Sequence, residues 1–481
     1  MMNIWNYWFP GVLKSLWANI CFWNSARRPL GALYYLPLYH FFSLNPQPYR
    51  IVQITILAAS IPMIYYLAWL LAGSRSATFL AVLALCYHAQ LATLVFVGSF
   101  IYDVLCGFFY FAALTYYVHI RKKGLQLRPM QLLAFLALYV CALNAKEMAV
   151  TLPLIVLVYE LLKYYDGSER QKLLQWIWHN AMPALLAGLF TAIYCYNKTR
   201  GPEFAGVETY TPHYSWDRFT SSNAHFVSEL FYHSVPIKGG MVLVIWVLVF
   251  AYAFLRRDHM LKLMAFWVVI VPLPLAFIPL RGGGCLYLLL FGWAMIFGKL
   301  VTDLIGLLAK SSALLDQGVG AGATTGAILG GTATNRVRGA AIGAILGVAA
   351  CKMSPRQLQV FATVAVASVL AIFTHWENQR FGYIRGLLMS EEKICHVIQA
   401  LRSLDLHPAS GSKIFVKEKH LFVNEWNVAF LAALVWNDHS LRIYPEGIFQ
   451  LDEQRMAEMS YVISLNETQA ELIRVPNSNS P

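Results

Sequence analysis

The sequence predicts an all-α polytopic membrane bundle of about ten transmembrane helices, followed by a small C-terminal extracytoplasmic α/β domain. Of the 481 residues, 58% are hydrophobic and only 13% are charged, whereas about a quarter of the residues in a soluble domain are charged. Many apolar stretches approach the roughly 20 residues that cross the hydrocarbon core as a helix. After residue 376 the composition becomes that of an ordinary soluble domain.

Charge and cysteine usage exclude other classes of protein. The formal net charge is +12, but Lys and Arg fall in short loops between apolar segments, where they set topology and contact anionic lipid. We therefore expect membrane lipid as a partner and no nucleic acid. Eight cysteines are scattered without C-x-x-C spacing, which argues against a disulfide framework or a zinc site. No ligand motif supports a divalent cation, so the cofactor is left open.

Ten apolar segments are expected to cross the membrane, and the cations between them mark the cytoplasmic loops. The segments are 51–72, 77–96, 101–120, 131–145, 148–164, 175–195, 241–255, 262–280, 285–309 and 357–375. The marking cations are Arg121, Lys122, Lys123, Lys163, Arg170, Lys172, Arg256, Arg257 and Lys262. Alternation then places on the outer side the loops 97–100, 145–147, 196–240 and 281–284 and the tail after residue 376.

The first 50 residues form a region of their own. The first convincing span must run from the outer to the cytoplasmic side, which leaves residues 1–50 outside as interfacial helices and a remnant of a first outer loop. Segment 4–23 is rich in Trp but also carries polar residues, and 30–42 is an aromatic helix expected to lie on the membrane. Either a first span is missing from this chain, or 4–23 crosses despite its polar residues.

A glycine-rich segment separates the last span from the rest of the bundle. Glycine recurs every four residues over Gly318–Gly330 and again over Gly339–Gly347, a spacing that lets two helices approach closely in lipid. The segment resembles a glycine-zipper hairpin. It either forms a helix–helix or oligomer contact through Gly318–Gly347, or is a low-complexity insertion. The predicted domain limits are 1–50, 51–310, 311–352, 353–376 and 377–481.

The C-terminal segment has the pattern of a small α/β domain. Ser412–Val416 alternates like a strand, Glu425–Val435 is expected to be a helix, and Leu441–Tyr444 a second strand. Tyr461–Leu465 and Ala470–Val475 are expected to form a terminal hairpin. No phosphate-binding glycine pattern occurs there, so no nucleotide site is predicted.

Lys146 and Glu147 are the first functional anchor. They interrupt an apolar stretch, residues 131–162, that is long enough for two spans. Ionisable side chains at membrane depth are costly and rare unless they pair or face a polar cavity. Pro153 follows where a helix would restart. The pair is expected either to form one wall of a site or to be an internal ion pair that stabilises the helix break.

Two further groups lie on the predicted outer side. Asp103, beside Tyr102, is expected to bind a cation or substrate hydroxyls, or else to reach the membrane surface. Arg281, followed by three glycines and then Tyr287, suits a lipid phosphate through bidentate contacts, or else anchors the chain at the interface. The acids and histidines of loop 197–239 match no zinc pattern and are expected to be solvated; they are Glu203, Glu208, His213, Asp217, His225 and His233.

Four segments carry a resemblance to a known family. They are RPLGALYYLPLYHFFSLNPQPYR, SFIYDVLCGFFYFAALTYYVHIRKKG, NAKEMAVTLPLIVLVYELL and RGGGCLYLLLFGWA. Together they resemble the bacterial polytopic glycosyltransferases of the GT-C superfamily, which includes the protein O-mannosyltransferases. The resemblance covers residues 30–310, and AKEMAVTLP is its most specific piece.

The resemblance implies a multi-pass enzyme of the bacterial inner membrane that takes a sugar from a polyprenyl-phosphate donor and transfers it on the outer face. Such transfer needs a base near the acceptor hydroxyl and a cation beside the leaving phosphate. Glu147 is the expected base, with Asp103 as the alternative. The expected contacts to the lipid phosphate are Lys146, Arg281 and Tyr287.

The sequence departs from the family pattern in one respect. Enzymes of this superfamily generally carry an acidic residue in the first outer loop, whereas residues 1–102 contain neither Asp nor Glu. We therefore expect little or no sugar transfer by this chain. Two other functions stay open. One is a transporter or flippase for a lipid-linked or polar solute, which should show internal repeats. The other is a non-catalytic assembly protein that works through the glycine hairpin.

Overall fold

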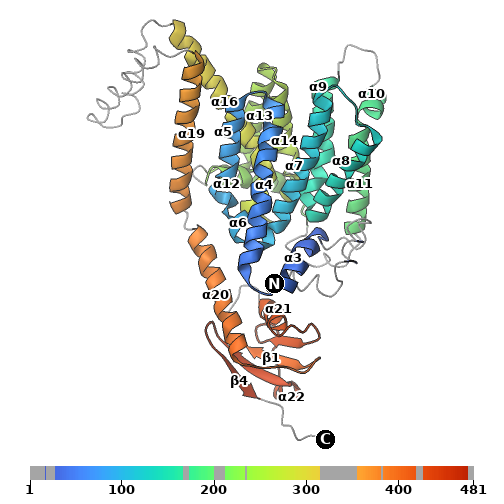
Figure 1. Cartoon of the computed structure of the whole chain (residues 1–481), viewed down its shortest axis with the longest axis vertical. Helices are drawn as coiled ribbons and strands as arrows, with labels where there is room; N and C mark the ends of the chain where they lie inside the picture. The colour runs from blue at the N-terminus through green and yellow to red at the C-terminus, as the bar shows by residue number, and fades with distance from the viewer. Residues whose placement is uncertain are drawn as a thin grey trace, which may run out of the picture.

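The computed structural model describes residues 28–165, 173–199, 212–232, 236–314, 355–380, 383–418 and 426–474, together with Leu13 and Trp17. It confirms the predicted fold class, a helical membrane bundle with a small C-terminal α/β unit (Figure 1). Five of the described helices are long and apolar enough to span a membrane: Pro46–Ala72, Gly98–Lys122, His259–Ala276, Gly283–Leu307 and Gln359–Gln379. Each of the ten predicted segments overlaps one of these, a shorter apolar helix, or α9 (Leu152–Tyr164).

Apolar side chains on the outside of the bundle support membrane insertion. Helix α13 (Gly239–Leu255) exposes Val247 and Leu248, and α19 (Pro355–Arg380) exposes Val369 and Ile372, each by more than 60%. Large apolar surfaces of this kind are unfavourable in water and favourable against lipid. The chain is therefore a multi-pass membrane protein.

The most extensive helix packing in the bundle involves α4 (Pro46–Ala72), α5 (Arg75–Cys86), α7 (Ile101–Lys122), α8 (Pro129–Ala145) and α16 (Tyr287–Leu314). Helix α16 packs closely along α5. A Cβ at Gly298 would overlap the backbone oxygen of Ala77, so glycine at this position allows the two helices to touch. Large side chains such as Trp267 and Tyr110 are fully buried in the same core.

The helices alternate in direction, so the charged loops between them lie at the two ends of the bundle. Helix α7 runs from Asp103 to Lys122, α8 returns to Lys146, and α9 runs back to Lys163 (Figure 1). Lys122 and Lys163 therefore lie at one end of the bundle. Asp103 and Lys146 lie at the other end, where the C-terminal unit is also found. Which end faces the cytoplasm stays a prediction.

Three predicted spans are broken, in each case at a recognisable position. Segment 77–96 is α5 followed by a 3-10 turn, Ala89–Ala92, and the short α6 (Thr93–Phe96). Between them the His88 imidazole donates to the Leu230 carbonyl and stacks on Tyr232, which holds the chain in a turn. Segment 175–195 is divided into α10 (Leu173–Asn180) and α11 (Met182–Thr199). Segment 262–280 is divided into α14 (His259–Ile270) and α15 (Leu273–Ala276) by two prolines.

Two helices lie close to the Lys146 end. Helix α3 (Leu30–Phe42) occupies the predicted aromatic segment. Helix α12 (Trp216–Leu230) lies inside the predicted outer loop 196–240 and begins at the Ser215 cap, whose hydroxyl accepts the Arg218 N–H. Its buried face includes Ser222 and Asn223, so this part of the loop is packed structure rather than solvated chain.

The C-terminal unit contains a four-stranded sheet in the order β2-β1-β3-β4. Strand β1 pairs in parallel with β2 and β3, and β3 pairs antiparallel with β4. The predicted strands, helix and terminal hairpin are confirmed. The elements are α20 (Tyr383–Ser403), β1 (Lys413–Lys417), α21 (Trp426–Val435), β2 (Arg442–Pro445), α22 (Glu453–Ala457), β3 (Tyr461–Leu465) and β4 (Ala470–Arg474). The Tyr39 hydroxyl of α3 donates to the Leu434 carbonyl of α21 and joins this unit to the bundle.

Some predictions fall outside the described residues. These are the helix at 4–23, the glycine hairpin Gly318–Gly347 with its oligomer contact, and the loop residues Glu203, Glu208 and His233.

Candidate functional site

The helix break at Lys146 is built into the local sequence. Helix α8 ends at Ala145, Lys146 has an extended backbone with φ −158° and ψ 151°, and a 3-10 turn runs over Glu147–Thr151. Helix α9 then starts with Pro153 in its first turn, where a missing N–H costs nothing. An extended backbone sends consecutive side chains to opposite sides. Lys146 and Glu147 therefore have different partners.

The first partner is Asp103. The Lys146 Nζ lies 2.5 Å from the Asp103 Oδ1, and both side chains are buried, with 8% and 7% exposed. Asp103 comes from the first turn of α7. The Lys146 ammonium also contacts the Cys285 Sγ at 3.4 Å, from the turn Gly283–Leu286 before α16. Three parts of the chain that lie far apart in the sequence therefore meet at one buried ammonium group.

The second partner is Arg28. Its guanidinium donates to both oxygens of Glu147, at 2.9 Å and 3.3 Å, a bidentate arrangement. The two side chains are 23% and 30% exposed. The Arg28 guanidinium also lies over the Tyr102 ring, 5.0 Å from its centroid. The predicted ion pair between Lys146 and Glu147 is thus wrong, because each side chain pairs across the chain instead of with its neighbour.

The two pairs form one cluster, which we call the paired-charge site: Arg28, Asp103, Lys146 and Glu147. Arg28 and Glu147 both act electrostatically on Asp103, so the two pairs lie close to each other. The site holds two cations and two carboxylates, so its charges balance. Burial of such pairs is tolerated only because each charge is compensated.

Arg28 and Cys285 were not among the sequence-predicted residues. Arg28 precedes Pro29 at the start of α3, in the region predicted to lie on the outer side. This position is the sequence feature that could have identified Arg28 as a site residue. Cys285 had a weaker signal, since it follows the glycines after Arg281. Pairing across 119 positions of sequence is invisible to any local pattern.

Arg281 is half-buried and starts the glycine turn that brings Cys285 to Lys146. Gly283 has φ +60°, a conformation that favours glycine. Its N–H donates to the Glu229 carboxylate at 3.3 Å, and the Gly284 N–H donates to the Thr93 hydroxyl at 2.8 Å. The backbone N–H groups of this glycine turn are therefore contacted by protein side chains.

Tyr287 lies within the helix packing. Its side chain is 4% exposed, its hydroxyl is 3.2 Å from the Ser60 Oγ of α4, and its ring packs edge-on against Phe111 of α7. The structure therefore places Tyr287 between α4, α7 and α16, facing other helices. Among the histidines and acids of the predicted outer loop, His213 and Asp217 are exposed, and the His225 Nε2 lies 3.6 Å from Glu229.

No group of three or more His, Cys, Asp or Glu side chains that could hold a metal ion occurs in the described part of the chain. The paired-charge site offers guanidinium and ammonium groups for an anion and two carboxylates for proton transfer.

The class of protein defined by this fold is a multi-pass helical membrane protein with a cluster of paired charges at one end. No family model matches the sequence, and no curated protein matches it. Among solved structures, the chain is similar to ArnT from Cupriavidus metallidurans bound to undecaprenyl phosphate, with a TM-score of 0.40 and 13% identity over 87% of this chain and 75% of that chain. A similarity of this size does not assign a function.

Proposed function

We propose that the chain is a GT-C-type glycosyltransferase, or a low-activity relative of one, that uses a polyprenyl-phosphate sugar donor. The observation that carries the proposal is the paired-charge site itself. Segments 28–50, 99–124 and 144–162, which carry the sequence resemblance, each contribute charged residues to it. The glycine segment that begins at Arg281 meets the same site through Cys285.

The proposed reaction follows from the chemistry of the groups. An acceptor hydroxyl attacks the anomeric carbon of the sugar, the bond from that carbon to the phosphate oxygen breaks, and the hydroxyl proton moves to a carboxylate. Glu147 is the better candidate for this base, because it is 30% exposed whereas Asp103 is 7% exposed. Asp103 would instead hold Lys146 in position.

Arg28 links donor binding to the base. A guanidinium that binds a carboxylate through two hydrogen bonds has the same geometry for a phosphate. A lipid phosphate that binds Arg28 would draw this cation away from Glu147, the proposed base. Lys146 and Arg281 would add positive charge beside the leaving phosphate.

The same arrangement explains why we expect little or no transfer. In the described structure both carboxylates of the site are held by cations, and residues 1–102 supply no further acid. Removal of a positioned base typically costs about 10²–10⁴ in rate. The proposed location is the bacterial inner membrane, with this site and the C-terminal unit on the outer face.

Two measurements test the proposal. The first is binding of undecaprenyl phosphate to the purified chain, expected for the native sequence and weakened in Arg28→Gln/Glu147→Gln, which preserves the charge balance. The second is sugar transfer from a polyprenyl-phosphate donor. Turnover that disappears in Glu147→Gln would make Glu147 the base, and turnover that survives would exclude it. Absence of lipid binding in the native chain would contradict the proposal.

A further inference from the structure

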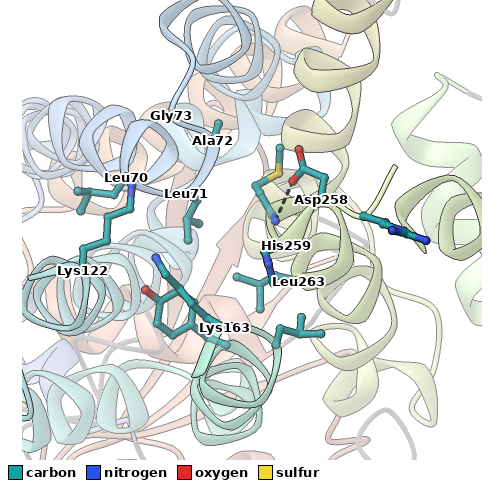
Figure 2. Close-up of a pocket in the computed structure, with 13 residues that line it drawn as sticks. Leu70, Leu71, Ala72, Gly73, Lys122, Lys163, Asp258, His259 and Leu263 are labelled. Atoms are coloured by element: carbon teal, nitrogen blue, oxygen red, sulfur yellow. Dashed lines mark hydrogen bonds between the residues drawn. The ribbon is translucent and has the colours of Figure 1, made fainter. Parts of the chain in front are cut away.

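A second charged region lies at the opposite end of the bundle from the paired-charge site. A cavity of about 380 Å³ opens there between the ends of four helices (Figure 2). Leu70–Gly73 of α4 and Lys122 of α7 line one side, and Tyr159, Leu162 and Lys163 of α9 line another. Residues 257–260 and Leu263, at the start of α14, complete the lining. We call this the basic cavity.

Short turns of defined geometry form its rim. Gly73 ends α4 with φ +65° and donates its N–H to the Trp69 carbonyl. Arg257 has φ +51° in the turn after α13. Asp258 caps α14 and accepts the N–H groups of Met260 and Leu261 at 2.9 Å and 3.2 Å. The cavity is therefore bounded by helix termini.

The charged lining of the cavity is mostly positive. Lys122 and Lys163 come from different helices and extend toward the same space in Figure 2. Lys122 acts on Lys163 as a like charge, and Glu160, which is paired with Arg121, acts on it as an opposite charge. Arg257 and His259 add to the lining. Among the described residues, no carboxylate pairs with Lys122, Lys163 or Arg257.

Asp258 is the single acidic residue among those that line the cavity, and it already has partners. Besides capping α14, the Asp258 carboxylate lies 3.4 Å from the Lys299 Nζ of α16. Lys299 also pairs with Asp303 at 2.8 Å. Asp258 therefore does not neutralise the lysines across the cavity.

The helix dipole accounts for part of this pattern but not for all of it. Cations at the last turns of α7 and α9 are favourable near the negative helix end, which explains Lys122 and Lys163. Arg257 precedes the first turn of α14, where the dipole favours an anion and Asp258 supplies one. The cavity therefore presents exposed positive charge, from Lys122, Lys163 and Arg257, that a negatively charged ligand can meet.

The apolar half of the lining indicates what kind of anion fits. Leu70, Leu71 and Leu263 stand beside the lysines on helices that are long and apolar enough to span a membrane, and Leu162 stands beside them on α9. A ligand with a phosphate at one end and a hydrocarbon chain at the other satisfies both surfaces. Basic pockets between transmembrane helices bind lipid headgroups in this way.

We propose that the basic cavity binds the phosphate headgroup of an anionic phospholipid from the adjacent leaflet. Lys122 and Lys163 contact the phosphate, and an acyl chain lies against the leucines. The site is independent of the proposed glycosyl transfer, since it lies at the other end of the bundle and uses none of the residues of the paired-charge site.

The test is lipid retention by the purified chain. The protein is incorporated in nanodiscs of phosphatidylcholine with a minor fraction of phosphatidylglycerol, released into mild detergent, and analysed by native mass spectrometry. Selective retention of phosphatidylglycerol is expected, and Lys122→Gln/Lys163→Gln should reduce its affinity about thirtyfold. Lys122→Arg/Lys163→Arg keeps the charge and should retain the lipid.

A matched control removes the same charge from the same end of the bundle. Lys123→Gln/Lys262→Gln changes two lysines that do not line the cavity and should leave retention unchanged. Equal loss in both glutamine variants would show a general surface-charge effect and overturn the proposal. Binding of inorganic phosphate that displaces the lipid at equal concentration would assign the cavity to a free anion and would also overturn it.

Discussion

The bundle contains two Arg–Glu pairs of similar geometry in different surroundings. Arg121 and Glu160 form a bidentate pair at 2.6 Å and 2.8 Å, with 6% and 0% of their side chains exposed. Tyr117 donates a further hydrogen bond to Glu160 at 2.8 Å. Arg28 and Glu147 form the second pair at the other end, with 23% and 30% exposed.

This difference in exposure distinguishes a pair that stabilises the fold from a pair that can exchange one partner for a ligand. In the buried pair, loss of one partner leaves an uncompensated buried charge. A partly exposed pair can give up one partner to an incoming phosphate at low cost, because water and ions reach it. Of the two carboxylates, Glu147 is therefore the one suited to function.

The largest expected effect is at the enclosed pair. Glu160→Gln should lower the free energy of unfolding by about 3–5 kcal/mol, because it leaves the Arg121 guanidinium buried without a counter-charge. Thermal unfolding of the purified protein in detergent measures this. Glu147→Gln is the matched control. Equal unfolding temperatures for the two variants would remove the distinction between the pairs.

The buried pair of the paired-charge site should show an intermediate effect. Asp103→Asn leaves the Lys146 ammonium group buried and should cost about 3 kcal/mol. Asp103→Asn/Lys146→Gln removes both charges and should recover most of that loss. Unfolding measured for the native chain, the single variant and the double variant checks the coupling. Additive losses in the double variant would show that the two side chains do not interact.

A small effect on stability is expected at the exposed pair. Glu147→Gln should change the free energy of unfolding by no more than about 1 kcal/mol, since exposed ion pairs contribute little. Raised salt should weaken the native pair and leave the variant unaffected. A loss as large as that of Glu160→Gln would mean that Glu147 is held for stability.

The smallest expected effect is at a surface carboxylate outside the membrane. The Ser440 backbone N–H, 2.8 Å away, lowers the pKa of Asp438 below its ordinary value, and the Ser440 hydroxyl adds to this. A lowered carboxyl pKa gives stability that is present above the unfolded-state pKa and is lost as pH falls through the folded-state pKa. Asp438→Asn should therefore weaken the acid dependence of unfolding slightly. An unchanged pH profile would contradict this.

Much of the fold was predictable because its signals are local. Apolar length identified the spans, alternation identified the strands, and the Lys146 break with Pro153 was correctly located. Turns fixed by tertiary contacts were missed, as at His88, where the partner is Leu230 of a distant helix. The site was predicted in part. Asp103, Lys146 and Glu147 do lie in one cluster, but which residue pairs with which is decided by the packing of distant segments. No feature of the sequence around Arg28 predicts that this residue pairs with Glu147.

Binding of undecaprenyl phosphate by the purified chain compares the two Arg–Glu pairs, one at each end of the bundle, in one experiment. Native mass spectrometry should show retention by the native sequence, a loss of about tenfold or more in Arg28→Gln/Glu147→Gln, and no comparable loss in Glu160→Gln under conditions where that variant is folded. Equal retention in the native chain and in Arg28→Gln/Glu147→Gln would contradict the assignment of the exposed pair as the lipid-phosphate site.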